Sequence, residues 1–490
     1  MLRACIAVAL AALLSPAGSL GAEPPAIRRV VVTGQPAPGG GAFDRFSVES
    51  LPIVAPVNDK GQVAFFATVV RGRTSEGFFL ASGARITKIA ADGDPVPGGG
   101  VFSGFGRHPI PALNNAGELA FAAAISGARA VEGIFVASER RVRVVALAGA
   151  TAPGIPSGTL ASVDVPAING RGDVAFLASV RRGRESLEAI YLHAGGKTRK
   201  VVAQGDPTPA GGSFAAFGPP SINGSGVIAF GAVVEGRAAP GGVFRAKGDA
   251  VRMIVAAGDE TPDGGIFAKF SERVALNDAG AVAFNAILKN APIAGAIYVI
   301  DDRLRRVVGL GDAAPGGGVF SHFGLWPSLS AMGTVGFIAS VDGASAPVAA
   351  FVTGLDGTTK VAAAGDGLPG GGKLVSFGLY PFAAMDDASA LAAKSALDSA
   401  GRLHDGAIVG QGVDRSVHGG INDRKEIDPA NRGSIVLGSV AFYLDRYGYD
   451  VLPIAMRMLR GEAVAPRTVT AHRLITAANV FIEYPPYDMN

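Results

Sequence analysis

A motif of the form Asn-x-x-Gly recurs along the first four-fifths of the chain at almost constant spacing. Clean copies begin at Asn58, Asn114, Asn169, Asn223 and Asn277, and altered copies begin at Ser330 and Asp386. Successive copies are 56, 55, 54, 54, 53 and 56 residues apart. A repeat of about 50 residues that holds only strand-like segments is typical of the blades of a β-propeller and not of a helical solenoid.

Each repeat contains four predicted strands. In the third repeat, the first strand is "PAIN" at 166–169 and the second is "VAFLASV" at 174–180. The third strand is short, as in "GIFVA" at 133–137, and the fourth is typified by "TRKVVAQG" at 198–205. Apolar alternation supports these strands, and Asn-x-x-Gly suits the turn between the first two because both residues tolerate positive φ. The predicted fold class is therefore all-β, with a seven-bladed β-propeller over residues 27–409.

The two ends of the repeat region predict how the ring closes. Residues 27–34, "IRRVVVTG", have a fourth-strand pattern with no earlier strands before them, and residues 406–409, "GAIV", have a third-strand pattern. Pairing these two half-units would complete the last blade and remove two exposed sheet edges. We therefore expect the N-terminal strand to close the propeller.

A second motif, Gly-Asp-x-x-Pro-Gly-Gly-Gly, follows the fourth strand. Its aspartates could be calcium ligands, but calcium needs six to eight oxygens, so we interpret them as Asx-type turn residues: Asp94, Asp206, Asp259, Asp312 and Asp366. The glycines precede a strand and no helix, which argues against a phosphate-binding loop. The Phe-x-x-Phe pairs that come next are interpreted as core contacts between blades: Phe43/Phe46, Phe102/Phe105, Phe214/Phe217, Phe267/Phe270 and Phe320/Phe323.

Every fourth strand also carries a cation near its middle. These residues are Arg29, Lys88, Arg143, Lys200, Arg252, Arg306 and Lys360. A basic rim is one interpretation. The other, which we favour, is that a charge on the outermost strand discourages pairing with another sheet edge.

The loop between each Phe-x-x-Phe pair and the following first strand varies from repeat to repeat. It is expected near the central channel, where binding residues are commonly placed on a rigid scaffold. Its non-repeating polar and aromatic residues are the candidate ligand-binding residues Arg107, His108, Arg273, Trp326 and Tyr380. Arginine and aromatic residues are enriched in binding surfaces, although the same side chains could simply fill the channel.

Composition limits the classes of function. A formal net charge of +3 with 17% charged residues argues against nucleic acid as a partner. The six histidines show no metal-ligand spacing and no Gly-x-Ser-x-Gly motif occurs, so we predict no metal, no cofactor and no catalytic residues. A glycosidase or lactonase that uses paired acidic residues is a second alternative.

The first residues have the pattern of an export signal. Arg3 precedes an apolar stretch at 6–14 and a region of small residues, so we predict a signal peptide over 1–22 and a periplasmic or secreted protein. Cys5 is the only cysteine and lies within this segment. No later apolar run approaches the roughly 18 residues that a membrane helix needs. We expect a monomer whose ligand is a protein or a carbohydrate.

The composition changes after Val409. A polar stretch, a buried strand and a helix that starts near Asp450 and ends at Gly461 predict a small C-terminal α/β segment over 410–490. The stretch "GSVAFYLDRYGYDVLPIAMRMLRGEAVAPRTVTAHRLITAANV" resembles the C-terminal end of periplasmic sugar-binding proteins of ABC transporters. In that family an aspartate after a glycine-rich strand end faces the sugar, which implies this role for Asp414.

Residues 27–409 in turn resemble exported bacterial proteins defined by tandem N-x-x-G-x-x-A-F repeats and, more distantly, Tol-type periplasmic propellers. The resemblance implies secretion and a repeat scaffold and brings no catalytic residues. The leading hypothesis is therefore an exported, non-enzymatic binding or scaffold protein. The alternative is a periplasmic solute-binding component that acts through the C-terminal segment.

Overall fold

The computed structural model describes residues 29–46, 55–105, 109–236, 240–324, 326–354 and 357–377, together with three strands nearer the C-terminus. Strands and turns make up these residues, and no helix occurs among them. None of the described residues forms a helix of the length and hydropathy that crossing a bilayer requires. Contacts divide the chain into two compact units, Met1–Pro381 and Phe382–Asn490.

The first unit contains six antiparallel sheets, which we call blades 1 to 6. Blade 1 contains β1 (Ala42–Phe43), β2 (Val63–Val70), β3 (Glu76–Ser82) and β4 (Arg85–Ala91). Blade 2 contains β5 (Val101–Gly104), β6 (Ala112–Leu113), β7 (Leu119–Ser126), β8 (Glu132–Ser138) and β9 (Arg141–Leu147). Blade 3 contains β10 (Gly158–Ile168), β11 (Val174–Arg182), β12 (Glu185–Ala194) and β13 (Lys197–Ala203).

The remaining blades repeat this order of strands. Blade 4 contains β14 (Ser213–Phe217), β15 (Ser221–Ile222), β16 (Ile228–Glu235), β17 (Gly241–Lys247) and β18 (Ala250–Ala256). Blade 5 contains β19 (Ile266–Phe270), β20 (Ala275–Leu276), β21 (Val282–Lys289), β22 (Gly295–Ile300) and β23 (Leu304–Gly309). Blade 6 contains β24 (Val319–Phe323), β25 (Ser328–Leu329), β26 (Val335–Asp342), β27 (Val348–Gly354) and β28 (Gly357–Ala363).

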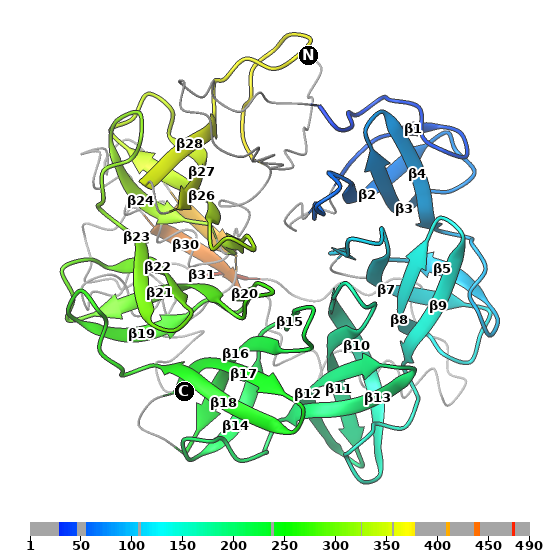
Figure 1. Ribbon diagram of the computed structural model, residues 1–490. Helices are drawn as coiled ribbons and strands as arrows, with labels where there is room; N and C mark the ends of the chain where they lie inside the picture. Colours follow the sequence, from blue (N-terminus) through cyan, green and yellow to red (C-terminus); the bar gives the residue numbers. More distant parts are fainter. Residues whose placement is uncertain are drawn as a thin grey trace. The chain divides into compact units, whose positions relative to one another are not determined.

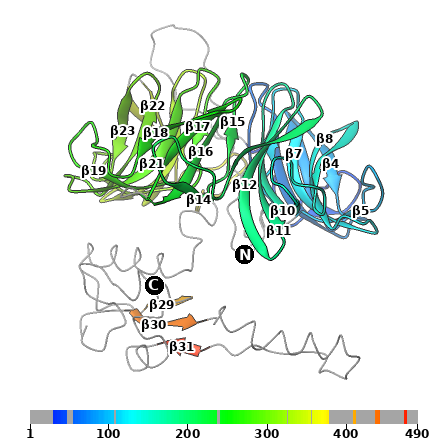
Figure 2. The same cartoon turned by 90° about the horizontal axis from the view of Figure 1, so that it is seen from below.

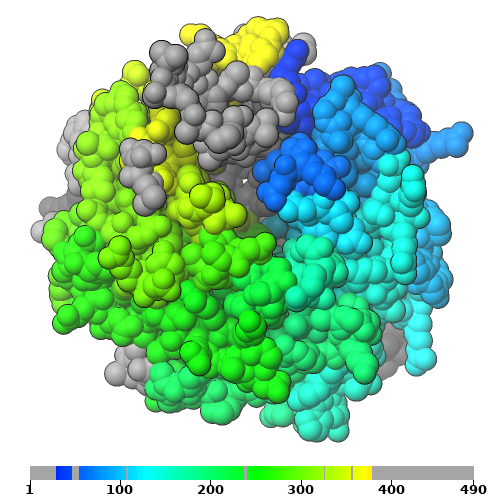
Figure 3. Space-filling view, in the orientation of Figure 1, coloured from blue at the N-terminus to red at the C-terminus, as the bar shows by residue number. Residues whose placement is uncertain are grey.

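The blades follow one another in sequence order around a common centre (Figure 1), and their side chains pack closely around it (Figure 3). The all-β propeller architecture predicted from the repeats is confirmed. The predicted number of blades is corrected: the structure describes six, not seven. The residues expected to form most of the seventh blade, 378–407, lie outside the described part of the chain.

The first strand of a blade differs from the prediction. The strand-like Phe-x-x-Phe segment, which is not among the four predicted strands of a repeat, pairs with the second strand of its own blade, as β14 does with β16. The two residues before the asparagine, in β15, pair with the other end of β16. The variable loop therefore interrupts the innermost strand, and in blade 3 this strand is continuous as β10.

Phenylalanine side chains form the core within and between blades. In blade 2, the ring of Phe102 packs edge-on against Phe135, with ring centroids 4.9 Å apart. Phe105 packs against Phe78 of blade 1 at 5.1 Å, which joins neighbouring sheets. Both members of this Phe-x-x-Phe pair are at most 1% exposed. The predicted core role of the pairs is therefore confirmed by these blades.

Three of the fourth-strand cations, Lys88, Lys200 and Arg306, pair with the aspartate of the Gly-Asp motif that follows them. Lys200 Nζ lies 2.8 Å from the carboxylate of Asp206, and the same carboxylate accepts the backbone N–H of Ala203. This confirms the predicted turn role of the Gly-Asp aspartate in blade 3.

The strand register shows that Arg143 aligns with Arg199 and not with Lys200, so the side chain of Arg143 faces the other side of its sheet.

The N-terminal segment contacts the turn that follows β28. The guanidinium of Arg29 lies beside Gly370, 2.6 Å from the position that a Cβ atom would take there. Lys360 of blade 6 lies in the same way beside Gly316, the equivalent glycine of the preceding turn. Arg29 thus occupies the place of a fourth-strand cation, and the two described ends of the repeat region meet. The expected pairing of residues 27–34 with 406–409 involves residues outside the described set.

In the second unit, three strands are described: β29 (Ile408–Gln411), β30 (Val436–Ala441) and β31 (Arg473–Ile475). β30 is central, with β29 parallel and β31 antiparallel to it (Figure 2). Residues 408–409, expected to end the last blade, thus belong to this mixed sheet. The helix predicted after Asp450 lies outside the described residues.

Candidate functional site

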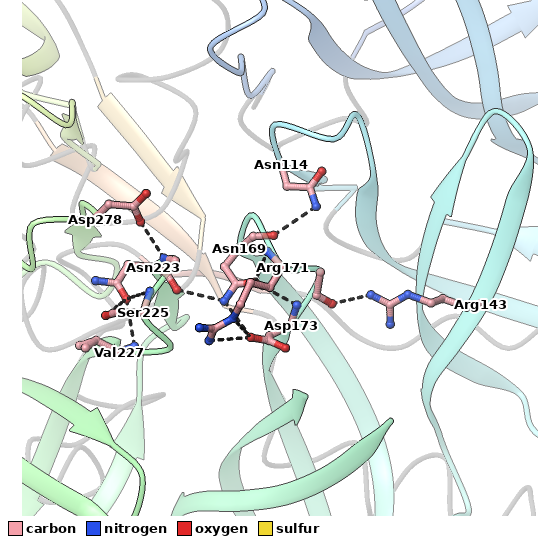
Figure 4. A network of polar contacts seen from close by, with 11 residues as sticks. Asn114, Arg143, Asn169, Arg171, Asp173, Asn223, Ser225, Val227 and Asp278 are labelled. Carbon is pink, nitrogen blue, oxygen red and sulfur yellow. Dashed lines mark hydrogen bonds and ion pairs between the residues drawn. The ribbon is translucent and has the colours of Figure 1, made fainter. Parts of the chain in front are cut away.

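A chain of hydrogen bonds joins the Asn-x-x-Gly turns of successive blades around the centre (Figure 4). Each asparagine donates a side-chain N–H to the backbone carbonyl of the residue at the same position in the next blade. The pairs, with their N–O distances, are Asn58 to Asn114 (2.9 Å), Asn114 to Asn169 (3.1 Å), Asn169 to Asn223 (3.0 Å), Asn223 to Asn277 (3.1 Å) and Asn277 to Ser330 (3.0 Å). We call these six residues the asparagine belt.

The asparagine side chain also shapes its own turn. Oδ1 of Asn169 accepts backbone N–H groups from Arg171 and Asp173, each at 3.0 Å. An aspartate would lack the donor that reaches the next blade, and a serine is too short to reach it. The residue type therefore follows from two tasks, closing a turn and joining two blades, and the belt is a structural feature rather than a binding site.

Beside the belt, a crevice of about 450 Å³ opens between blades 2 and 3. Glu118 and Arg143 reach it from blade 2, and Arg171, Asp173 and His193 reach it from blade 3. Glu118 and Asp173 follow belt asparagines by four residues, so the turns place both carboxylates at the rim. Arg143 lies on β9 and His193 on β12, which brings the two acids, two arginines and the histidine to one cavity.

The charges in this crevice are only partly paired. Arg171 holds Asp173 through two N–H groups, at 2.9 and 3.0 Å, whereas Arg143 donates to the backbone carbonyl of Gly172. Glu118 accepts an N–H from Asn114 at 2.9 Å. Burial lowers the pKa of His193, the charge of Arg143 lowers it further, and Asp173 partly opposes both. The imidazole is therefore neutral at neutral pH.

A second candidate site lies where the variable loops of blades 5 and 6 meet. The guanidinium carbon of Arg273 lies 5.3 Å from the ring centroid of Trp326, which is cation–π geometry. Both side chains are half-buried, so part of each remains accessible. Burial lowers the pKa of Arg273 from its ordinary value. The sequence predicted both residues at the channel, and the structure brings them into contact.

Neighbouring loops hold this pair in place. Asn285 of blade 5 donates to the carbonyl of Gly324, two residues before Trp326, at 2.6 Å. On the other side, Gly218 of blade 4 packs so closely against the loop of Arg273 that a Cβ atom would lie 1.8 Å from the carbonyl oxygen of Glu272. The loops therefore form continuous contacts from blade 4 to blade 6.

The other predicted site residues are not placed. Arg107, His108, Tyr380 and Asp414 lie outside the described residues. Of the five charged or titratable crevice residues, the repeated motifs single out only Arg143, as a fourth-strand cation, because the other four stand at positions whose residue type differs between repeats. Aligning the blades by strand register and comparing the residues at equivalent positions identifies them.

The fold and the belt define a tandem-repeat β-propeller. The chain belongs to a family of unknown function (DUF7453), whose model matches residues 20–303 and 265–421. Two overlapping matches agree with a repeated architecture. The search of curated proteins finds no match. The narrower resemblances, to proteins with N-x-x-G-x-x-A-F repeats and to sugar-binding proteins, stay predictions.

Several solved structures are similar at low identity. An oligogalacturonate lyase in complex with manganese has a TM-score of 0.40 and 13% identity, over 68% of this chain and 84% of that chain. The Hadza microbial sialidase gives 0.34 and 11%, over 64% and 65%. A lectin from Aleuria aurantia in complex with Fucα1-6GlcNAc gives 0.32 and 11%, over 66% and 98%. At these TM-scores the similarity carries no argument about ligand or activity.

Proposed function

We propose that the protein is an exported binding protein that takes its ligand on the variable loops of the propeller. The contact between Arg273 and Trp326 is the observation that supports this proposal most directly. Two loops of different blades supply one residue each, and neither residue recurs at the equivalent position of the other repeats. A rigid scaffold with non-repeating loops is the usual arrangement of a binding surface.

The ligand class that suits this pair is a carbohydrate. A partly exposed indole offers an apolar face on which a sugar ring can stack, and an arginine offers several N–H donors to hydroxyl or carboxylate oxygens. Contacts with Asn285 and Gly218 hold the backbone beside both residues before a ligand arrives, which lowers the entropy cost of binding. A binding role needs no catalytic group, and the proposal assigns none.

Tryptophan fluorescence tests the proposal directly, because Trp326 is the only tryptophan in the chain. Titration with neutral and acidic oligosaccharides should change its emission, and Arg273→Gln should weaken the response at least tenfold. Arg303→Gln, on the exposed hairpin of blade 5, is the matched control and should leave the response unchanged. An emission spectrum unaffected by every oligosaccharide would reject the proposal.

Export rests on the predicted signal peptide over residues 1–22, and it places the protein in the periplasm or outside the cell. Cell fractionation followed by mass determination of the mature N-terminus tests it. Cleavage near residues 19–22 is expected. Full-length protein in the cytosol would contradict the proposed localisation and leave the binding test intact.

The alternative binding role belongs to the C-terminal segment. The observation that motivates it is the mixed three-stranded sheet of β29, β30 and β31, whose parallel pair β29–β30 differs from the antiparallel sheets of the blades. Calorimetry with pentoses and hexoses separates the two roles. Binding lost in Asp414→Ala and kept in Arg273→Gln would favour a solute-binding component.

A further inference from the structure

The crevice between blades 2 and 3 differs in chemistry from the equivalent places between the other blades. The strand register identifies five equivalent positions at each interface. The earlier blade supplies two of them, the fourth residue after its belt residue and one residue of its fourth strand. The later blade supplies three, the second and fourth residues after its belt residue and one residue of its third strand. Between blades 2 and 3 these are Glu118, Arg143, Arg171, Asp173 and His193. Between blades 4 and 5 they are Val227, Arg252, Ala279, Ala281 and Ile300.

The same comparison holds for the other described interfaces. The five positions are Gln62, Thr87, Ala116, Glu118 and Ala137 between blades 1 and 2, and Asp173, Arg199, Ser225, Val227 and Ala246 between blades 3 and 4. Between blades 5 and 6 they are Ala281, Arg305, Met332, Thr334 and Thr353. Among the described interfaces, five titratable side chains therefore converge at one alone. The fold does not require them, since the other blades pack without them.

Within the crevice, two opposite charges lie side by side without pairing. Oε2 of Glu118 and Nη2 of Arg143 each lie 3.2 Å from the position that a Cβ atom would take at Gly172. Both side chains belong to the described part of the chain, yet no ion pair joins them. Glu118 keeps one carboxylate oxygen, and Arg143 several N–H groups, for a further partner.

We propose that this crevice binds a small zwitterion of the α-amino-acid type, with its carboxylate on Arg143 and its ammonium group on Glu118. An arginine presents parallel N–H donors that match the two oxygens of a carboxylate, and a glutamate accepts from an ammonium group. The volume of about 450 Å³ lies in the usual range for small-ligand pockets, about 300–1,000 Å³. Arg171 and Asp173, which satisfy each other, form the wall, and His193 contributes a neutral ring beside it.

Isothermal titration calorimetry of the full-length protein with individual L-amino acids tests the proposal. We expect at least one amino acid to bind, and we expect Glu118→Gln and Arg143→Gln each to weaken that binding at least tenfold. Glu118→Gln keeps the oxygen that accepts from Asn114, so the turn should stay folded. Arg252→Gln is the matched control, because Arg252 aligns with Arg143 in a crevice without carboxylates, and it should bind as the unmodified protein does.

Ligand analogues keep the test independent of the folding of the variants. The N-acetyl derivative of the bound amino acid lacks the ammonium group and the amide derivative lacks the carboxylate, so each should bind at least tenfold more weakly. Equal binding of the N-acetyl derivative would overturn the zwitterion proposal in favour of a simple carboxylate ligand. No heat with any amino acid would overturn it altogether. Neither result bears on Arg273 and Trp326, which lie between other blades.

Discussion

The side chain of Asn169 donates a hydrogen bond to the backbone carbonyl of Asn223, 54 residues further along the chain, at 3.0 Å. The same side chain accepts two backbone N–H groups of its own turn and donates to the carboxylate of Asp173. Asn169 is 4% exposed, so water cannot replace these partners. One residue thus closes a turn, joins two blades and orients a carboxylate of the crevice.

The belt predicts a large loss of stability for Asn169→Ala. Removal of the amide leaves several buried polar groups without partners, and each such group costs about 1–3 kcal/mol. We expect the free energy of unfolding to fall by about 2–4 kcal/mol in urea denaturation. Ser330→Ala, at the exposed end of the belt, is the control and should cost less than about 1 kcal/mol. Similar losses for the two variants would mean that the belt does not join the blades.

Blades 3 and 4 differ in whether a fourth-strand residue can form an ion pair with the aspartate of the following turn, and this difference predicts two opposite changes in stability. Lys200 pairs with Asp206, and Met253 occupies the equivalent position before Asp259 in blade 4. Lys200→Met should lower the free energy of unfolding by about 0.5–1 kcal/mol, since the pair is only partly exposed. Met253→Lys should raise it by up to about 0.5 kcal/mol. Both changes in the free energy of unfolding should be smaller in 1 M salt. Changes that do not depend on the salt concentration would argue against ion pairing.

Much of the scaffold could be predicted from the sequence because each repeat encodes the same local structure. The turn at Asn169 and the alternation in β11 are local signals, and both agree with the structure. The acceptor of the Asn169 side chain could not be predicted, because only ring geometry brings Asn223 beside it. A pattern of strands alone does not say which segments separated by a whole repeat will touch.

The side of a sheet on which a residue lies was the harder part of the prediction. Arg143 and Arg252 were grouped with Lys200 as cations near the middle of a fourth strand. A shift of one residue reverses the face of a strand, so only the register shows that both arginines face the other side. This shift is the reason that Arg143 reaches the crevice. The candidate sites thus depend on departures from the repeat, which a search for repeated motifs passes over.

The loop of Arg273 predicts an effect of Gly218 on binding. A Cβ atom at residue 218 would overlap the carbonyl of Glu272, next to Arg273, so Gly218→Ala must displace the loop or the strand. We expect a loss of stability of about 1–3 kcal/mol and a shifted emission spectrum of Trp326. Gly170→Ala, where a Cβ atom meets open space, is the control and should change neither measurement. An unchanged spectrum in Gly218→Ala would show that the loops are independent.

Tyr191 predicts a change in stability at high pH. Its side chain is fully buried, and its hydroxyl finds no hydrogen-bond partner among the described residues. Burial, with a smaller contribution from Asp206, raises its pKa to about 12. The unfolded chain ionises near pH 10 and the folded chain later, so this contribution to stability is complete below pH 10 and is lost as the pH rises toward 12.

The variant Tyr191→Phe isolates this contribution, since phenylalanine occupies the equivalent position in β8 and β17. At pH 7 the variant should be as stable as the unmodified protein or up to about 1 kcal/mol more stable, because a buried hydroxyl without a partner is removed. By pH 11 its advantage should grow by about 1.4 kcal/mol. Urea unfolding at both pH values measures the difference, and an advantage that does not grow would contradict the assigned pKa.

The contact between Arg29 and Gly370 predicts that the N-terminal segment closes the ring in solution. Arg29→Cys and Gly370→Cys, combined with Cys5→Ser, place one thiol on each side of this contact. A short bis-maleimide should join them within one chain, and peptide mass spectrometry would identify the linked pair. The control is Arg29→Cys with Gly316→Cys, because Gly316 is the equivalent glycine one blade earlier and lies beside Lys360 instead. Arg29 fills the place that Lys360 fills in blade 6, so only the first pair should react. Equal linkage of both pairs would show that the N-terminal segment is not fixed at the end of the ring.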